Sequence, residues 1–193
     1  MEGLITKIDV ARRQLATAIR LFFDGGDAVS IYSLATNAWE VIDFLCDKAG
    51  VDSISNQTRE HITDGKDLKL HYINSPYRNF FKHADRDAEI VLPDIGDSIV
   101  DSILYLAVED YLRLVNKSPI EFQVFQLWYL ASNIEKVSAG SLNSILRAID
   151  PAFPGIRELP RKEQVQMGRK VLEGVSSDKG LLADCRTEPA FLE

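Results

Sequence analysis

The sequence predicts an all-α protein, built as an antiparallel four-helix-type bundle with additional C-terminal helices. Hydrophobic residues recur at steps of three and four along most of the chain, which is the spacing of helices that bury one face. Glycine, proline and capping residues fall between these stretches, and no stretch alternates polar and apolar residues as a half-buried strand would. The 193 residues, 46% of them hydrophobic, are enough for one sizeable core.

The first two periodic stretches predict a helical hairpin. The first stretch ends at Gly25-Gly26, and Asp27 or Ser30 is a suitable N-cap for the second, with Gly50 as its C-cap. Because the turn between them is short, the two helices are expected to pack in opposite directions. Their inward positions are Leu4, Ile8, Ala11, Leu15, Ala18 and Phe22, then Ile31, Leu34, Ala35, Ala38, Ile42 and Leu45.

Residues 51–116 complete the predicted bundle. The pattern is weak over residues 51–74, where one or two short helices separated by loops are expected. Ser75-Pro76 predicts a helix start, since serine is a good N-cap and proline fits the first helical position. Asp94 is expected to cap the next long helix. The inward residues of that helix would be Ile95, Ile99, Ile103, Leu106 and Leu114.

The periodicity divides the chain into three regions. Residues 1–116 are expected to form the bundle that carries the candidate site. Residues 117–175 are expected to be a helical extension packed on the bundle, because the segment around Phe125 and Trp128 is apolar nearly all round. Residues 176–193 are predicted to be a flexible tail.

The charge distribution limits the partners that the chain can take. A net charge of −7 and a pI near 5.0 argue against a protein that coats nucleic acid non-specifically, because such binding needs many Lys and Arg side chains to neutralise phosphates. Residues 59–86 are an exception, with six basic side chains against four acidic ones. A locally positive segment of this kind suits a small anionic target.

Two further features concern the location of the protein and its cysteines. No apolar run is long enough to cross a bilayer, and the N-terminal residues lack the pattern of a secretory leader. We therefore expect a cytoplasmic protein without a membrane partner. Cys46 and Cys185 are too few for a disulfide framework or a metal site, and we expect Cys46 to pack in the core. Trp39 and Trp128 are expected to pack in the core or at an interface.

The strongest candidate for a functional site is the sequence Arg78-Asn79-Phe80-Phe81-Lys82-His83 at the predicted helix start. An arginine, an adjacent polar residue and a histidine after three variable positions, on an all-helical chain, resemble the motif of the HEPN superfamily of helical bundle domains. The resemblance covers residues 1–116 and rests almost entirely on these six residues. It implies a metal-independent endoribonuclease that works as a homodimer with its two motifs facing each other.

The resemblance assigns the chemistry to Arg78, Asn79 and His83. Histidine can take a proton from the ribose 2′-hydroxyl or return one to the leaving oxygen, and arginine can stabilise the charge on the reacting phosphate. Asn79 would orient the imidazole or a phosphate oxygen, and Lys82 and Arg86 would help to bind the RNA or nucleotide. No metal or other cofactor is expected. Such an enzyme would suit a toxin or defence effector, with an antitoxin or another regulatory protein as its partner.

Other interpretations of the same residues stay open. Arg78 can pair with a nearby carboxylate, for which Glu40 and Asp43 are candidates, and His83 can end its helix, where a cation is favoured. A HEPN-like module that binds nucleotide, RNA or protein without catalysis is a further alternative. On an ideal helix Arg78 and His83 would point about 140° apart, so a dimer or a distorted first turn would be needed to bring both to one phosphate.

The three histidines of the chain offer a weaker alternative. His61, His71 and His83 could be combined with Asp64 or Asp85 into a zinc site. The spacing matches no recognised ligand pattern, however, and no His-Glu-x-x-His sequence is present. We therefore expect no metal in the site.

Overall fold

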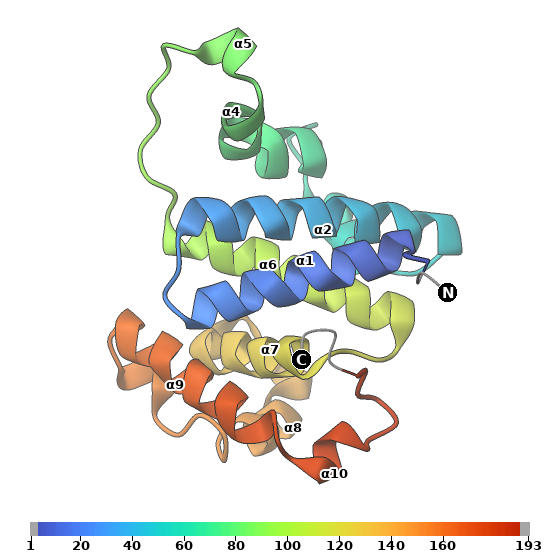
Figure 1. Cartoon of the computed structure of the whole chain (residues 1–193), viewed down its shortest axis with the longest axis vertical. Coiled ribbons are helices and arrows are strands. Elements are labelled where there is room, and N and C mark those ends of the chain that lie inside the picture. Colours follow the sequence, from blue (N-terminus) through green and yellow to red (C-terminus); the bar gives the residue numbers. More distant parts are fainter. Residues whose placement is uncertain (1–3, 190–193) are drawn as a thin grey trace.

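A computed structural model describes residues 4–189 of the chain as a bundle of helices, which confirms the all-α prediction (Figure 1). Within these residues no helix is both long and apolar enough to span a bilayer. The elements in chain order begin with α1 (Lys7–Phe23), α2 (Ala28–Ala49), α3 (Ile54–His61), the π-helical segment η1 (Leu68–Arg78), α4 (Asn79–Lys82), α5 (Ala84–Asp87) and α6 (Asp97–Val115). They continue with α7 (Ile120–Ser132), the 3₁₀ turn η2 (Ile134–Lys136), α8 (Ala139–Ile149), the 3₁₀ turn η3 (Ile156–Glu158), α9 (Arg161–Val175) and α10 (Lys179–Leu182).

The predicted hairpin of α1 and α2 is confirmed, and its ends follow local chemistry. The Asp27 side chain accepts a hydrogen bond of 2.8 Å from the backbone N–H of Ser30 and caps α2. Gly50 ends the helix with a φ of 66°, in the left-handed region that favours glycine. In the turn, a Cβ on Gly26 would lie 2.9 Å from the carbonyl oxygen of Leu21, so the tight connection depends on glycine.

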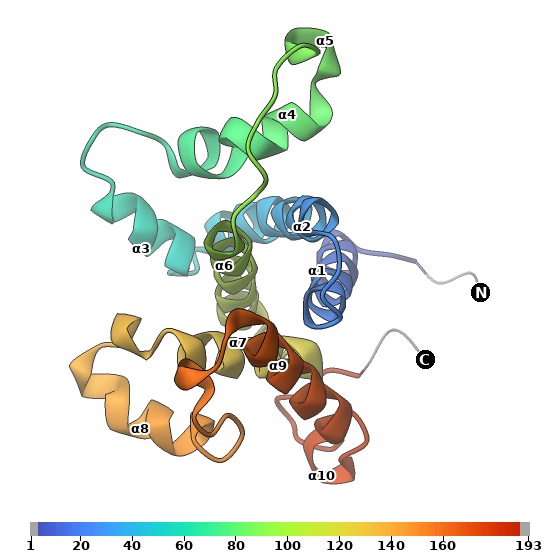
Figure 2. The same cartoon turned by 90° about the vertical axis from the view of Figure 1, so that its left-hand side faces the viewer.

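Helices α2 and α6 are neighbours that run in the same direction. Tyr32, early in α2, and Ile103 of α6 line one cavity, while late in both helices the Cys46 thiol lies 3.6 Å from the carbonyl oxygen of Asp110. Parallel neighbours cannot be joined by a tight turn. They are joined by residues 50–96, which we call the crossover segment, and which carries α3, η1, α4 and α5. Figures 1 and 2 show α4 and α5 projecting away from α1, α2 and α6.

Helix α7 supplies the fourth long helix of the core. The Phe22 ring of α1 contacts the rings of Phe125 and Trp128, with centroids 5.3 Å and 5.0 Å apart. Tyr105 of α6 stacks on Tyr129 of α7 at 4.0 Å. Cys46 is fully buried, as predicted, and so are Trp39 and Trp128. The motif helix is short and lies outside this set of four.

The start of α6 corrects two sequence predictions. The helix begins at Asp97, after Gly96, and not directly after Asp94. The Asp94 carboxylate instead accepts a hydrogen bond from its neighbour, the backbone N–H of Ile95, at 3.0 Å. Ile95 is buried ahead of the helix, whereas Ile99, predicted to point inward, is 37% exposed.

The C-terminal region differs from the predicted flexible tail over residues 176–189. Helix α10 forms there, and the chain then returns to the bundle, where Ser118 and Thr187 make an isolated β-bridge. The Tyr111 hydroxyl donates a hydrogen bond of 2.7 Å to Glu188, whose carboxylate also pairs with Arg12 at 3.3 Å. Residues 190–193, also part of that prediction, lie outside the described residues.

A buried carboxyl connects α2, α3 and α6. Asp110 is fully buried and accepts hydrogen bonds from the hydroxyl and the backbone N–H of Ser55, at 2.5 Å and 3.1 Å. The indole N–H of Trp39 donates to the same Ser55 hydroxyl oxygen at 2.9 Å. Within residues 4–189 no cation pairs with Asp110. Hydrogen bonds from Ser55, with a smaller contribution from the backbone N–H of Ile54, compensate the burial of this carboxyl.

The free energy of unfolding of Asp110→Asn, compared with that of wild type, is expected to increase as the pH rises. Burial raises the pKa of Asp110 above its ordinary value of 3.8, although the Ser55 hydrogen bonds oppose the effect. The stabilisation that comes from the bound proton is complete below pH 3.8 and is lost as the pH rises through the raised pKa. Asparagine does not titrate, so the free energy of unfolding of the variant minus that of wild type should increase from acidic to neutral pH.

Urea unfolding at a series of pH values measures this difference. Asp47→Asn, which removes one negative charge from an exposed position of α2, is the control. The prediction is wrong if both variants follow the same pH trend.

Candidate functional site

The motif lies where the crossover segment changes direction twice. Ser75 has non-helical angles (φ −106°, ψ 136°), and helical turns resume after it, so the predicted helix start is confirmed. The backbone N–H of Asn79 donates to the carbonyl oxygens of Asn74 and Pro76. The helix ends after Lys82, and His83 leaves the helical region (φ −121°, ψ 53°). The chain therefore departs from a regular α-helix in two places: in the first turn, where the Asn79 N–H bonds residues five and three positions back, and at His83, where the helix ends.

Arg78 is held against helix α2. Its guanidinium forms an ion pair with the Glu40 carboxylate and donates to the side-chain oxygens of Asn74, at 2.9 Å, and of Asn37, at 3.4 Å. The Arg78 side chain is only 12% exposed, and its Nε is buried without a hydrogen-bond partner. The orientation of this guanidinium is therefore fixed by three side chains.

Lys82 lies beside Arg78 because residues four apart share one face of a helix. Its ammonium donates to the same Asn37 oxygen at 3.0 Å. Partial burial and the charge of Arg78 both lower the pKa of Lys82, while Glu40 opposes them. Two cations thus converge on one neutral acceptor.

Glu40 is the negative centre of the cluster. Lys69 pairs with one of its oxygens at 2.6 Å, and Arg78 pairs with the other. Burial acts to raise the pKa of Glu40, but the hydrogen bonds and charges of Lys69 and Arg78 outweigh it and lower the pKa. With three cations and one carboxylate, the cluster formed by Asn37, Glu40, Lys69, Arg78 and Lys82, which we call the α2 cluster, has an excess of positive charge.

The ion pair of Arg78 agrees with the alternative in which this residue pairs with a nearby carboxylate instead of acting in catalysis. Of the two carboxylates considered from the sequence, Glu40 contacts Arg78, whereas Asp43 binds Arg59 through both oxygens, at 2.9 Å and 2.6 Å. A guanidinium that is already paired must exchange or share Glu40 when a phosphate arrives. The energetic gain from binding an anion is smaller as a result.

The other predicted site residues are less constrained. Asn79 is exposed, and its side-chain amide has no hydrogen-bond partner within residues 4–189. The half-buried His83 imidazole also has none in that range, and no hydrogen bond joins it to Arg78. Arg86 is exposed on α5, away from the ion pairs found in the described part of the chain. The structure therefore brings Arg78 and Lys82 together and leaves the side chains of Asn79, His83 and Arg86 available.

The histidines do not assemble into a metal site. Within residues 4–189, no three His, Cys, Asp or Glu side chains are grouped as metal ligands. His61 lies near the carbonyl oxygen of Gln57, with Nδ1 at 2.7 Å, and His71 accepts a hydrogen bond from the backbone N–H of Asp67 at 2.9 Å. The two rings thus have separate local partners.

Sequence reasoning named Glu40 as a candidate partner of Arg78 but missed two other contacts of that residue. Asn37 lies three residues before Glu40 on α2, and Asn74 precedes Arg78 by four residues. Helical spacing relates each of these asparagines to its neighbour, but it does not indicate that both would bind the Arg78 guanidinium. Lys69 belongs to the positive segment, and nothing else in the sequence singles it out.

No family model, curated protein or solved structure matches this chain.

Proposed function

We propose that the protein is a metal-independent endoribonuclease of the HEPN type that is active as a homodimer. The proposal rests on the convergence of Arg78 and Lys82 on one oxygen of Asn37, directly before the helix ends at His83. Two cations that share one neutral acceptor gain from the arrival of an anion, and an RNA phosphate is such an anion. Lys69 adds a third positive charge against the single carboxylate of the cluster.

The proposed chemistry gives each motif residue a separate task. Arg78 stabilises the negative charge that develops on the reacting phosphate, and Lys82 binds an adjacent phosphate oxygen. His83 takes the proton from the ribose 2′-hydroxyl or returns one to the leaving oxygen. Asn79 orients the imidazole or the phosphate, and Arg86 extends the basic surface along the RNA. All of these steps use side chains of the protein alone.

A second copy of the chain is part of the proposal. Arg78 and His83 make no direct contact within one chain. A two-fold axis through the motif face would bring His83 of one copy toward Arg78 of the other, so that both act on one phosphate. Activity should therefore depend on dimer formation.

The test is RNA cleavage in the presence of EDTA. Wild type and His83→Ala are purified in parallel and incubated with the same labelled single-stranded RNA, and the mass of each protein in solution is measured by light scattering. Chelator-resistant cleavage by wild type, with cyclic phosphate product ends and a dimeric mass, is the expected result. If wild type leaves the RNA intact, or if both proteins cleave it equally, the proposal is wrong.

A role as a toxin or defence effector belongs to the same proposal. Expression of an RNA-cleaving wild type is expected to slow the growth of the host cell, while expression of His83→Ala is not. Colony counts after induction measure this difference. Equal growth of the two strains would argue against a toxin.

A non-catalytic binding module is the second candidate. The ion pair between Arg78 and Glu40 favours it, because the Arg78 side chain is 12% exposed and already has an anionic partner. In that case the motif face binds RNA, a nucleotide or a protein and leaves it unchanged. Retention of labelled RNA in a gel-shift experiment, with no cleavage products, identifies this function.

A further inference from the structure

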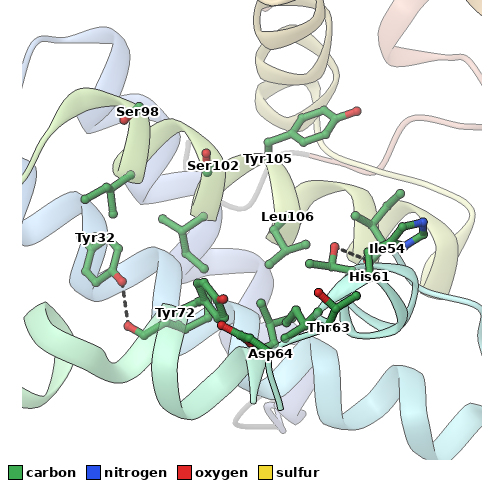
Figure 3. Close-up of a pocket in the computed structure, with 16 residues that line it drawn as sticks. Tyr32, Ile54, His61, Thr63, Asp64, Tyr72, Ser98, Ser102, Tyr105 and Leu106 are labelled. Carbon is green, nitrogen blue, oxygen red and sulfur yellow. Dashed lines mark hydrogen bonds between the residues drawn. The ribbon is translucent and has the colours of Figure 1, made fainter. Parts of the chain in front are cut away.

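A cavity of about 750 Å³ lies between α6 and the crossover segment, and none of the five predicted site residues lines it. Figure 3 shows Ser98 and Ser102 of α6 on one side, with Thr63, Asp64 and Tyr72 of the crossover segment on the other. The volume is within the range of about 300–1,000 Å³ that is usual for small-molecule sites. Walls from separate parts of the chain make it a concave site rather than a single flat face.

The lining combines buried apolar side chains with hydroxyl groups. Leu68, Ile73 and Ile103 are buried members of the core that reach the cavity. Hydroxyl side chains at the cavity include Thr63, Ser98, Ser102 and three tyrosines, while the Thr58 hydroxyl already donates to the carbonyl oxygen of Ile54 at 2.8 Å. Because a hydroxyl can donate and accept hydrogen bonds, these groups suit a ligand that carries carbonyl or hydroxyl oxygens.

The charges at the cavity favour a neutral ligand. No Lys or Arg belongs to its described lining, and the ring Nδ1 of its histidine, His61, lies 2.7 Å from the carbonyl oxygen of Gln57, so an anion would be desolvated there without a permanently charged partner in the lining. The one carboxylate, Asp64, is already paired with Lys66 at 2.7 Å. The cavity therefore differs in kind from the positively charged α2 cluster.

Two apolar side chains at the cavity are exposed, while its other apolar side chains are buried or half-buried. Ile99 is 37% exposed and Tyr72 is 47% exposed, and both belong to the lining. A protein partner would need about 800 Å² of contact on each side, which two side chains around a concave site do not provide. A small molecule that enters the cavity can cover both.

We propose that this cavity binds a neutral, largely apolar compound of drug-like size that carries hydrogen-bonding oxygens. The site is independent of the proposed cleavage of RNA, because its lining excludes Arg78, Asn79 and His83. Tyr32 links the two regions: it lines the cavity, donates a hydrogen bond of 2.7 Å to the carbonyl oxygen of Ile73, and its ring lies 6.3 Å from that of Phe81.

Fluorescence titration with Nile red, a neutral ring compound with oxygen acceptors, tests the proposal. Wild type should bind one equivalent saturably, and Ser102→Trp, which fills the cavity from α6, should weaken the affinity by about tenfold or more. Ser144→Trp, at an exposed serine of α8, is the matched control and should bind as wild type does. Dissociation constants are compared rather than signal amplitudes, because the added indole can change the emission.

Two further measurements keep the test decisive. Ser98→Trp fills the same cavity from a neighbouring turn and replaces Ser102→Trp if circular dichroism shows that the latter is unfolded. The anion anilinonaphthalene sulfonate should bind more weakly than Nile red to wild type. If the tryptophan variants on α6 and on α8 bind Nile red with equal affinity, the ligand does not bind in this cavity and the proposal is wrong. If wild type binds the anion more tightly than Nile red, the proposed preference for a neutral ligand is wrong.

Discussion

Replacing His83 by alanine is expected to lower the rate of RNA cleavage in chelator by about a hundredfold or more, the usual contribution of a positioned acid–base group. The half-buried imidazole has no hydrogen-bond partner within residues 4–189, and it lies where the helix ends. Its removal therefore leaves the Arg78 contacts unchanged and removes the group that moves the proton. The single-turnover rate with excess protein measures this step.

The matched control is His71→Ala. His71 is exposed in the same crossover segment, and its ring contacts the backbone of Asp67 rather than any motif residue. This variant should cleave RNA at the wild-type rate. The role of His83 as the acid–base group is contradicted if the two alanine variants have equal rates, or if His83→Ala retains more than about a tenth of the activity.

Gly168→Ala is expected to destabilise the protein by about 1–3 kcal/mol, the usual cost of overpacking. A Cβ on Gly168 would lie 2.1 Å from Cε1 of Phe23. The Phe23 ring is 2% exposed and meets Trp128 edge-on at 6.0 Å, so it cannot turn aside without disturbing the core. Helix α9 must move away from α1 instead, and the midpoint of urea unfolding should fall.

Gly174→Ala on the same helix is the control for this prediction. Apart from its chain neighbours and the backbone of its own helix, no described atom lies within 4 Å of the position of its Cβ. The substitution should therefore stabilise the protein by up to about 1 kcal/mol, because alanine favours helix. A rise in the unfolding midpoint for both glycine variants would contradict the close approach of α9 to Phe23.

Features set by neighbouring residues could be predicted from the sequence. The cap at Asp27, the end of α2 at Gly50 and the break at Ser75 each depend on a few adjacent positions. The buried tryptophans follow from the apolar pattern of their helices. Such signals are local, so one sequence is sufficient to detect them.

Features set by competition or by tertiary contact could not be predicted. Asp94 has the side chain of an N-cap, but it bonds its own neighbour, and the helix begins three residues later at Asp97. Ile99 fits the inward stripe of α6, yet it faces a cavity that exists only when the crossover segment has folded beside it. Periodicity identifies the apolar face of a helix but not the element that covers it.

The candidate site also combines a feature that is local in sequence with features that depend on tertiary contacts. The motif could be found as a sequence, whereas its contacts with Glu40 and Asn37 join residues 38 and 41 positions apart in the chain. Those contacts depend on where the crossover segment places η1 against α2. The choice between a catalytic Arg78 and a structural one therefore depends on tertiary structure, and the motif alone cannot decide it.

The parallel arrangement of α2 and α6 has a consequence for how the protein folds. Before these helices can pack, the ends of the crossover segment must come together, at an entropic cost that a tight turn avoids. The contacts between α2 and α6 are consequently distant in sequence, which slows folding relative to an up-and-down bundle. The crossover segment is also the region where local opening can occur while the bundle stays folded. Amide hydrogens of η1 and α4 should then exchange faster than those of α2.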